Sequence, residues 1–318
     1  MTSYVLLEKI QVQNANCIAG FTYGFPTVTS FLGLTHHLSR QLKNIIGVSF
    51  NGCAIFCHDY HIDSYQDYYT KFIQSRNPPS TLKGKSSEAK SPAPIIEEGK
   101  MDMTVSLLLR CDDILSSRDD DKDDYTKAIK NTLFKSRLAG GTIKNVKNVH
   151  LLSRHHQLWR EVKAKLLPCF VLLDKTELLK EHCDNNPNQP LLDSWTDFFA
   201  IKHKAHQDEE GNISWQKVIP PNKKGWIVPL MIGYKAISQL YEPNEVKNVR
   251  DSTYPFRFVE AVHGLGEWRS LHRFYQHDDI DALFWRYDID DIWYLCKQIS
   301  MVEKSDDFDL SDYSDYEL

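Results

Sequence analysis

The chain has 318 residues and a mass of 36.9 kDa, enough for one large domain or two modest ones. Its 42% hydrophobic and 25% charged residues exclude disorder of the whole chain. No stretch reaches the ~18 consecutive apolar residues of a membrane helix, and the first residues lack the basic start of a secretory signal. Because the seven cysteines form no CxxC pair, we expect reduced thiols and a cytoplasmic protein without a membrane partner.

Acidic residues are concentrated in two segments. The tail 305–318 carries six acids and no base, and segment 112–124 carries seven acids against two bases. The rest of the chain is therefore basic, although the net charge of the whole chain is −5. Residues 125–168 hold ten Lys or Arg and one acid, Glu161, which fits either a polyanion-binding surface or a solvated helix face.

The first half of the chain predicts the order strand, helix, strand, strand, helix, strand. Pro26 suits a first helical turn, and Gly140-Gly141 suits the end of the second helix. The expected strands are residues 5–12, 45–60 with a turn at Asn51-Gly52, 101–111 and 142–152, and the expected helices are 26–42 and 126–138, with loops at 14–25, 76–95 and 112–124. This order predicts an α+β, ferredoxin-like domain over residues 1–152, the fold of RNA-recognition domains, with a hairpin inserted near 76–100.

The second half, residues 153–304, predicts a further α+β or helical part. We expect helices at 153–167, 175–183, 191–203 and around 283–299, and strands at 169–173, 213–218, 225–232 and 254–262. After the last of these strands, HGLGEWRS (263–270) predicts a glycine-rich turn whose backbone N–H groups can approach a phosphate. The acidic tail 305–318 is predicted to be disordered.

No catalytic or cofactor motif is present in the sequence. The GxGxxG pattern at Gly264 and Gly266 is incomplete, and there is no Walker loop, GxSxG or HExxH. Histidine pairs such as His36-His37 lack a fourth ligand at zinc-like spacing, and the acidic run 119–124 is typical of a solvated loop. We expect no metal, no cofactor and no catalytic residue, although thirteen histidines leave a metal-free nuclease open.

Aromatic residues lie near bases along the chain, among them Tyr23, Trp226, Tyr234 and Trp268. Single-stranded RNA is held by base stacking on aromatic rings together with phosphate contacts. Several of these aromatic residues must instead belong to the core, and periodicity does not separate the two groups.

Five segments in the same order resemble one family. They are NANCIAGFTYGFPTVTSFLGLTHHLSRQL (14–42), IIEEGKMDMTVSLLL (95–109), RLAGGTI (137–143), GWIVPLMIGYKAISQLYEPNEVKNVRD (225–251) and RFVEAVHGLGEWRSLHR (257–273). Together they resemble the second Csy subunit of the type I-F CRISPR surveillance complex, a Cas-five-like member of the repeat-associated (RAMP) proteins. Residues 175–212, the acidic loop and the acidic tail depart from the family pattern.

The resemblance implies a non-catalytic RNA-binding subunit that acts in antiviral defence. Such a protein pairs with the large Csy subunit, and the pair caps the 5′ handle of the CRISPR RNA. It also contacts the first backbone Csy subunit, commonly through a protruding hairpin, and meets target DNA in the assembled complex. We expect that hairpin, the thumb, at residues 76–95.

We expect the RNA-binding face to combine arginines and glycines from both halves of the chain. Arginines would bind phosphate or stack, glycines would admit close backbone approach, and aromatic rings would stack on bases. The expected residues are Asn14, Asn16, Arg137, Gly140, Gly141, Lys144, Trp226, Tyr234, Arg250, Arg257, His263, Gly264, Gly266, Trp268 and Arg269. Two alternatives stay open: a metal-independent endoribonuclease of the same fold group that processes guide RNA, and an assembly-only subunit.

Overall fold

A computed structural model describes residues 3–75, 95–111, 115, 119–207, 211–220, 223–249, 251–275 and 280–298. The predicted thumb, apart from Ile95, together with Arg250 and the acidic tail, lies outside these residues. None of the helices in the described ranges is long and apolar enough to cross a membrane.

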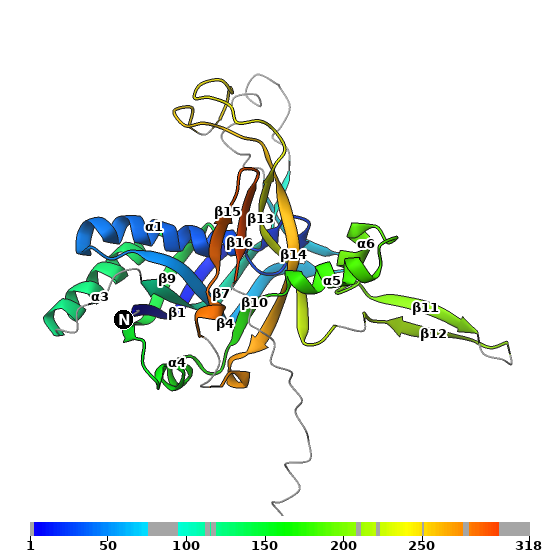
Figure 1. The fold of residues 1–318 in the computed structure, drawn as a ribbon, viewed down its shortest axis with the longest axis horizontal. Coiled ribbons are helices and arrows are strands. Elements are labelled where there is room, and N and C mark those ends of the chain that lie inside the picture. Colours follow the sequence, from blue (N-terminus) through cyan, green and yellow to red (C-terminus); the bar gives the residue numbers. More distant parts are fainter. Residues whose placement is uncertain are drawn as a thin grey trace, which may run out of the picture.

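The molecule is built on one 12-stranded sheet, whose main path runs β15-β16-β13-β14-β10-β4-β7-β1-β9-β8 (Figure 1). Its pairings are antiparallel, and β5 and β6 extend it from β4. The strands of the first half are β1 (Ser3–Asn16), β4 (Phe50–Gln66), β5 (Thr70–Ser75), β6 (Ile96–Glu98), β7 (Lys100–Cys111), β8 (Arg137–Leu138) and β9 (Gly141–Ser153). Those of the second half are β10 (Phe170–Asp174), β13 (Trp226–Ala236), β14 (Val259–Ser270), β15 (Arg286–Ile289) and β16 (Trp293–Lys297).

Two helices cover one face of the sheet in the first half. Helix α1 (Val28–Ile46) buries Phe31, Leu34, Leu38 and Leu42, spaced three or four apart as an amphipathic helix requires. Helix α3 (Asp119–Phe134) adds Ile129 and Leu133 to the same core. The predicted order of strands and helices is therefore present, and among these strands the spatial order is β4-β7-β1-β9.

The opposite face is covered by helix α4 (Leu158–Leu166) and the 3₁₀ turns η1 (Leu271–Arg273) and η2 (Ile280–Leu283). Alternate residues of β1 point to the two cores: Tyr4 and Leu6 pack under α4, while Val5 and Leu7 pack under α1. The β10 strand of the second half pairs with β4, so both halves of the chain build one continuous sheet.

Smaller elements flank the sheet. The loop predicted at 14–25 begins within β1, which runs to Asn16, and continues as a short hairpin of β2 (Ile18–Ala19) and β3 (Thr22–Tyr23). Helices α5 (Thr176–Asn185) and α6 (Leu191–Thr196) lie beside β14, and β11 (Lys202–Gln207) pairs with β12 (Ile213–Val218) in a separate ribbon.

Several predictions of local structure were wrong. The helix expected at 126–138 ends at Phe134, and Arg137 and Leu138 form β8. The helix expected at 191–203 ends at Thr196, and Lys202 begins β11. HGLGEWRS belongs to strand β14 and is not a turn, because β14 pairs with β13 and with β10 through this segment. The stretch around 283–299 forms η2 and the β15–β16 hairpin instead of a helix. Asn51-Gly52 lies at a register shift within β4 rather than at a turn. The acidic run belongs partly to α3, which begins at Asp119 and continues into the apolar stripe of Ile129 and Leu133.

Candidate nucleic-acid interface

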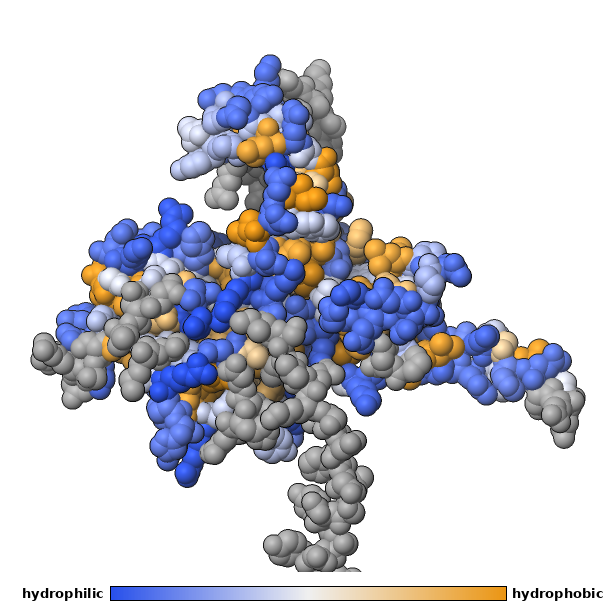
Figure 2. All heavy atoms as spheres, viewed as in Figure 1, coloured by the Kyte–Doolittle hydropathy of each residue, from blue (hydrophilic) through white to orange (hydrophobic). Residues whose placement is uncertain are grey.

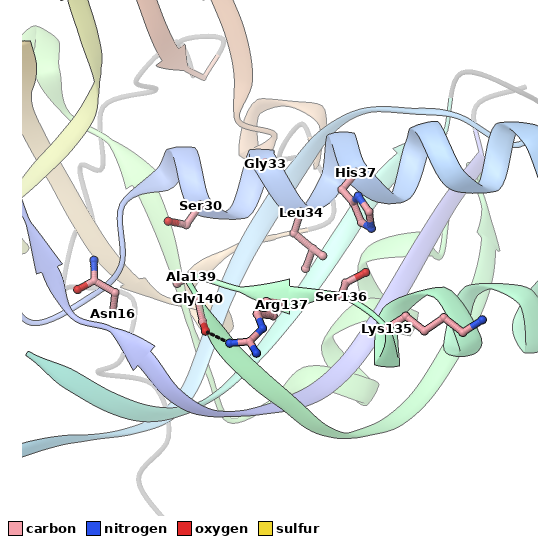
Figure 3. Close-up of a pocket in the computed structure, with 10 residues that line it drawn as sticks. All are labelled: Asn16, Ser30, Gly33, Leu34, His37, Lys135, Ser136, Arg137, Ala139 and Gly140. Carbon is pink, nitrogen blue, oxygen red and sulfur yellow. Dashed lines mark hydrogen bonds between the residues drawn. The ribbon is translucent and has the colours of Figure 1, made fainter. Parts of the chain in front are cut away.

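A groove lies between the N-terminal half of α1 and the connection from α3 through β8 to β9 (Figure 3). Its volume is about 440 Å³. It is lined by Asn16, Ser30, Gly33, Leu34, His37, Lys135, Ser136, Arg137, Ala139 and Gly140. The predicted site residues Asn16, Arg137 and Gly140 therefore lie together in one cleft.

The turn at the floor of the groove has a backbone that glycine makes possible. Ala139 and Gly140 both adopt the left-handed region, with φ of 50° and 76°. A Cβ on Gly140 would meet nothing within 4 Å, so this residue leaves its side of the groove open. A Cβ on Gly141 would lie 2.8 Å from backbone atoms of Ala15, so the close approach at Gly141 is to strand β1 and not to a ligand.

Positive charge in the groove comes from Lys135 and Arg137. Both side chains are exposed, and neither pairs with a carboxylate among the residues that the structure describes. Arg137 donates to the carbonyl of Gly140 at 3.2 Å, which holds its guanidinium over the turn. His37, one turn of α1 beyond Gly33, faces the same cleft.

Of the two predicted asparagines, Asn16 lines the groove and Asn14 does not. Asn16 closes one end of the groove, and its amide is engaged with Ile18, to which it donates at 2.9 Å while accepting at 3.2 Å. Asn14 is exposed in the left-handed region and its backbone N–H donates to Asp102, outside the groove lining. Lys144 is exposed on β9 and is also not part of the lining.

A second cavity, of about 310 Å³ and mainly apolar, brings two predicted stacking residues together. Trp226 and Trp268 are directly paired across β13 and β14, and Trp226 is half exposed. The ring of Trp226 meets Phe170 edge-on at 5.7 Å, and that of Trp268 meets Phe25 edge-on at 4.8 Å. His58 also lines the cavity, and burial lowers its pKa although it contacts the carbonyl of Pro168.

The other residues expected from β14 are held by the protein itself. Arg269 donates twice to Glu267, at 3.1 and 2.8 Å, and Glu267 is buried. A Cβ on Gly264 would lie 2.3 Å from Thr176 Oγ1, and one on Gly266 would lie 3.1 Å from Leu230, so both glycines permit packing inside the molecule.

His263, Arg257 and Tyr234 are not part of the groove lining. The ring of His263 packs between Phe21 at 5.1 Å and Trp195 at 5.3 Å, and burial lowers its pKa. Arg257 donates to the backbone carbonyl of Asp291. Tyr234 is half-buried between β14 and β16.

The four expected arginines therefore do not share one open cationic face among the described residues. Arg269 and Arg257 are paired within the fold, Arg250 is not described, and Arg137 alone lies in the groove. Sequence reasoning also missed Ser30, Gly33, His37 and Lys135. The spacing of Ser30, Gly33 and His37 by three or four residues on one helix was the available signal, since it places small and polar side chains on a single stripe.

The structure describes no group of three or more His, Cys, Asp or Glu side chains able to hold a metal ion within the ranges given above.

The family model of CRISPR-associated protein Cas_Csy2 matches residues 5–296. The chain is also similar to CRISPR-associated protein Csy2 of Pseudomonas aeruginosa strain UCBPP-PA14, with 31% identity over 322 residues. That similarity covers 89% of this chain and 94% of the relative, and the family match includes the groove, the apolar cavity and β14.

Proposed function

The chain belongs to the Csy2 family of type I-F CRISPR surveillance subunits, and from that membership we propose that it is a non-catalytic subunit that binds the 5′ handle of the guide RNA. In this role it pairs with the large Csy subunit and contacts a backbone subunit, and target DNA is held by the assembled complex.

The topology of the first half supports this proposal. Strands β9, β1, β7 and β4 lie in that order with α1 and α3 on one face, which we assign to the ferredoxin-like plan of the RAMP proteins. The groove lies where α1 meets the connection that leads into β9, so its walls come from the two helical connections of that plan.

The observation that carries the proposal is the chemistry of the groove. Lys135 and Arg137 offer cations that no described carboxylate neutralises, and phosphate oxygens are the partners that such side chains favour in RNA complexes. Gly33 and Gly140 place one residue without a side chain on each wall, and at these two points a ribose-phosphate backbone can approach closely. Because backbone contacts position a strand without reading it, the groove fits the anchoring of a fixed handle.

Base contacts are proposed at the apolar cavity. Tyr23, Trp226 and Trp268 present rings from the β2–β3 hairpin and two strands, and unpaired bases of RNA stack on such rings. We leave Arg269, Gly264 and Gly266 out of the RNA face, since each is already committed to a contact within the fold.

The proposal is tested by guide retention in the complex of the full chain with its large partner. Lys135→Gln and Arg137→Gln together are expected to weaken binding of labelled handle RNA and to reduce the salt dependence by about 1.4 log units per log unit of salt, since each single-strand contact contributes ~0.7. Lys180→Gln is the matched control, because Lys180 is exposed on α5 and pairs with Glu177 at 2.9 Å. An unchanged salt slope in the groove variant would contradict the proposal.

A further inference from the structure

The β11–β12 ribbon projects from the molecule on the side of α5 and α6, away from α1, α3 and the groove (Figure 1). Every residue of β12 is exposed, and so is every residue of β11 except Lys202. A two-stranded ribbon with both faces in water is only marginally stable by itself. We therefore expect the arm to bind another molecule.

The base of the arm is fixed to the body by one carboxylate. Asp197 accepts hydrogen bonds from His182 Nε2 at 2.9 Å, from Gln189 Nε2 at 2.8 Å and from Lys202 Nζ. Lys202 is the first residue of β11, whereas His182 and Gln189 belong to α5 and the segment after it. Asp197 thus ties the first residue of the arm to the body of the molecule.

The register of the ribbon sorts its side chains onto two faces. Trp215 lies opposite Ala205, Lys217 opposite His203 and Ile213 opposite Gln207 on one face. Lys204 lies opposite Gln216 on the other face. Trp215 is 71% exposed, and the small Ala205 across from it leaves the indole ring open.

The charge of the two strands has a single sign. They carry three lysines, two histidines and no acid. Lys202 is engaged by Asp197, while Lys204 and Lys217 have no carboxylate partner among the residues that the structure describes. Figure 2 shows hydrophilic and hydrophobic side chains next to one another along this arm. The acids of the connecting loop, Asp208–Glu210, lie outside the described residues.

We propose that the β11–β12 arm is a second contact for single-stranded RNA, in which Trp215 stacks on an unpaired base while Lys217, on the same face of the ribbon, binds a phosphate. Trp215 shares its face with Lys217 and His203. An exposed indole beside a cation is the combination that binds single strands without reading their sequence. A polyanion complements the two strands, because they carry bases and no acid, and the three acids between them are confined to residues 208–210. The choice of RNA over DNA rests on the proposed function of the groove, and the arm lies beyond that groove.

The test uses the full chain and labelled oligouridine, with variants made both in the native chain and in the Lys135→Gln/Arg137→Gln background. Trp215→Ala is expected to weaken binding roughly 10-fold, within the range measured for single stacking residues. Lys217→Gln is expected to lower the salt slope by about 0.7, whereas Lys204→Gln, on the opposite face of the ribbon, should leave the slope unchanged. Tyr254→Ala, at a 68% exposed aromatic in the β13–β14 connection, and Lys180→Gln are the matched controls.

The outcomes separate the two sites. A loss caused by the arm variants in both backgrounds, with unchanged circular dichroism, supports the arm even where the groove variants have no effect. Unchanged oligouridine binding overturns the arm proposal and leaves the groove untouched. If the arm variants weaken the binding of oligothymidine more than the binding of oligouridine, the assignment to RNA is overturned. Loss of a co-purifying Csy subunit with intact oligonucleotide binding also overturns the proposal, because it makes the arm a protein contact.

Discussion

Two segments of this chain pair glycine with arginine, and they serve different ends. In the connection from α3 to β9, Gly140 lies in a left-handed turn beside Arg137 at an open groove. In β14, Gly264 and Gly266 lie in a central strand, with Arg269 bound to buried Glu267. The same residue types therefore make a candidate phosphate site in one segment and an internal packing surface in the other.

The difference is decided by what occupies the space that a Cβ would take. At Gly140 that space is empty, so the backbone is available to a ligand. At Gly264 it is filled by Thr176 of α5, which lets the helix lie close against the strand. A nearby acid determines in the same way whether an arginine is available to a ligand. Glu267 accepts two hydrogen bonds from Arg269, whereas no described carboxylate pairs with Arg137.

The largest effect is expected from valine at the packed glycine. Gly264→Val forces atoms into the contact with Thr176 and Ile232, so we expect the free energy of unfolding to fall by about 3 kcal/mol, the upper part of the range for overpacking. Gly140→Ala is the matched variant and should lose only the ~1 kcal/mol of a left-handed alanine. Urea denaturation compares the two, and an equal or smaller loss at Gly264 would contradict the packing role.

The arginines give the second test. Arg269→Met removes two charge-assisted hydrogen bonds to a buried carboxylate, and we expect about 2 kcal/mol less stability with an unchanged salt slope of RNA binding. Arg137→Met should do the reverse, with stability nearly unchanged and the slope lower by about 0.7. Urea denaturation of both variants measures the stability, and salt titration of RNA binding measures the slope. The comparison between the segments fails if Arg269→Met alters the slope as much as Arg137→Met does.

Much of the first half could be predicted from the sequence because its signals are local. The stripe from Phe31 to Leu42 fixes α1, and the alternation in β7 and β9 fixes strands. The β14 segment was misassigned because its glycines are typical of turns, and only the partners on both sides, β13 and β10, make it a strand. Such pairings join residues far apart in the chain, and no local pattern reports them.

The candidate site was predictable to the same extent. RLAGGTI gave Arg137 and Gly140 because a glycine pair beside a base is typical of a turn that leads into a strand, although Arg137 and Leu138 form β8 and not the helix end predicted there. The opposite wall, with Gly33 and His37, required knowing which face of α1 meets β8. The engagement of Arg269 by Glu267 two residues away was present in the sequence, but the burial of Glu267 that strengthens it was not.

Gly33 sharpens the comparison from the helix side. It lies in the middle of α1, is exposed and has nothing within 4 Å of its missing Cβ. Gly33→Ala should therefore raise stability by about 0.5 to 1 kcal/mol, as alanine does in a helix, while its methyl group narrows the groove and weakens handle binding. Thermal unfolding and RNA binding on the same samples check both signs. Binding that improves together with stability would place the RNA elsewhere.

The smallest effect concerns His263, next to the packed glycine in β14. Burial lowers the pKa of His263, and the hydrogen bond to the carbonyl of Ala19 opposes that shift only in part. The folded pKa of His263 is below the unfolded value of 6.5, so the unfolded chain binds the proton first as the pH falls. The contribution of His263 to stability is therefore complete above pH 6.5 and is lost as the pH falls toward the folded pKa. The loss of stability is at most about 1.4 kcal/mol for each unit by which the folded pKa lies below the unfolded pKa. The difference in unfolding free energy between the native chain and His263→Gln should therefore be constant above pH 7 and should change as the pH falls below 6.5. A difference that stays flat over this range would mean that His263 is exposed to solvent.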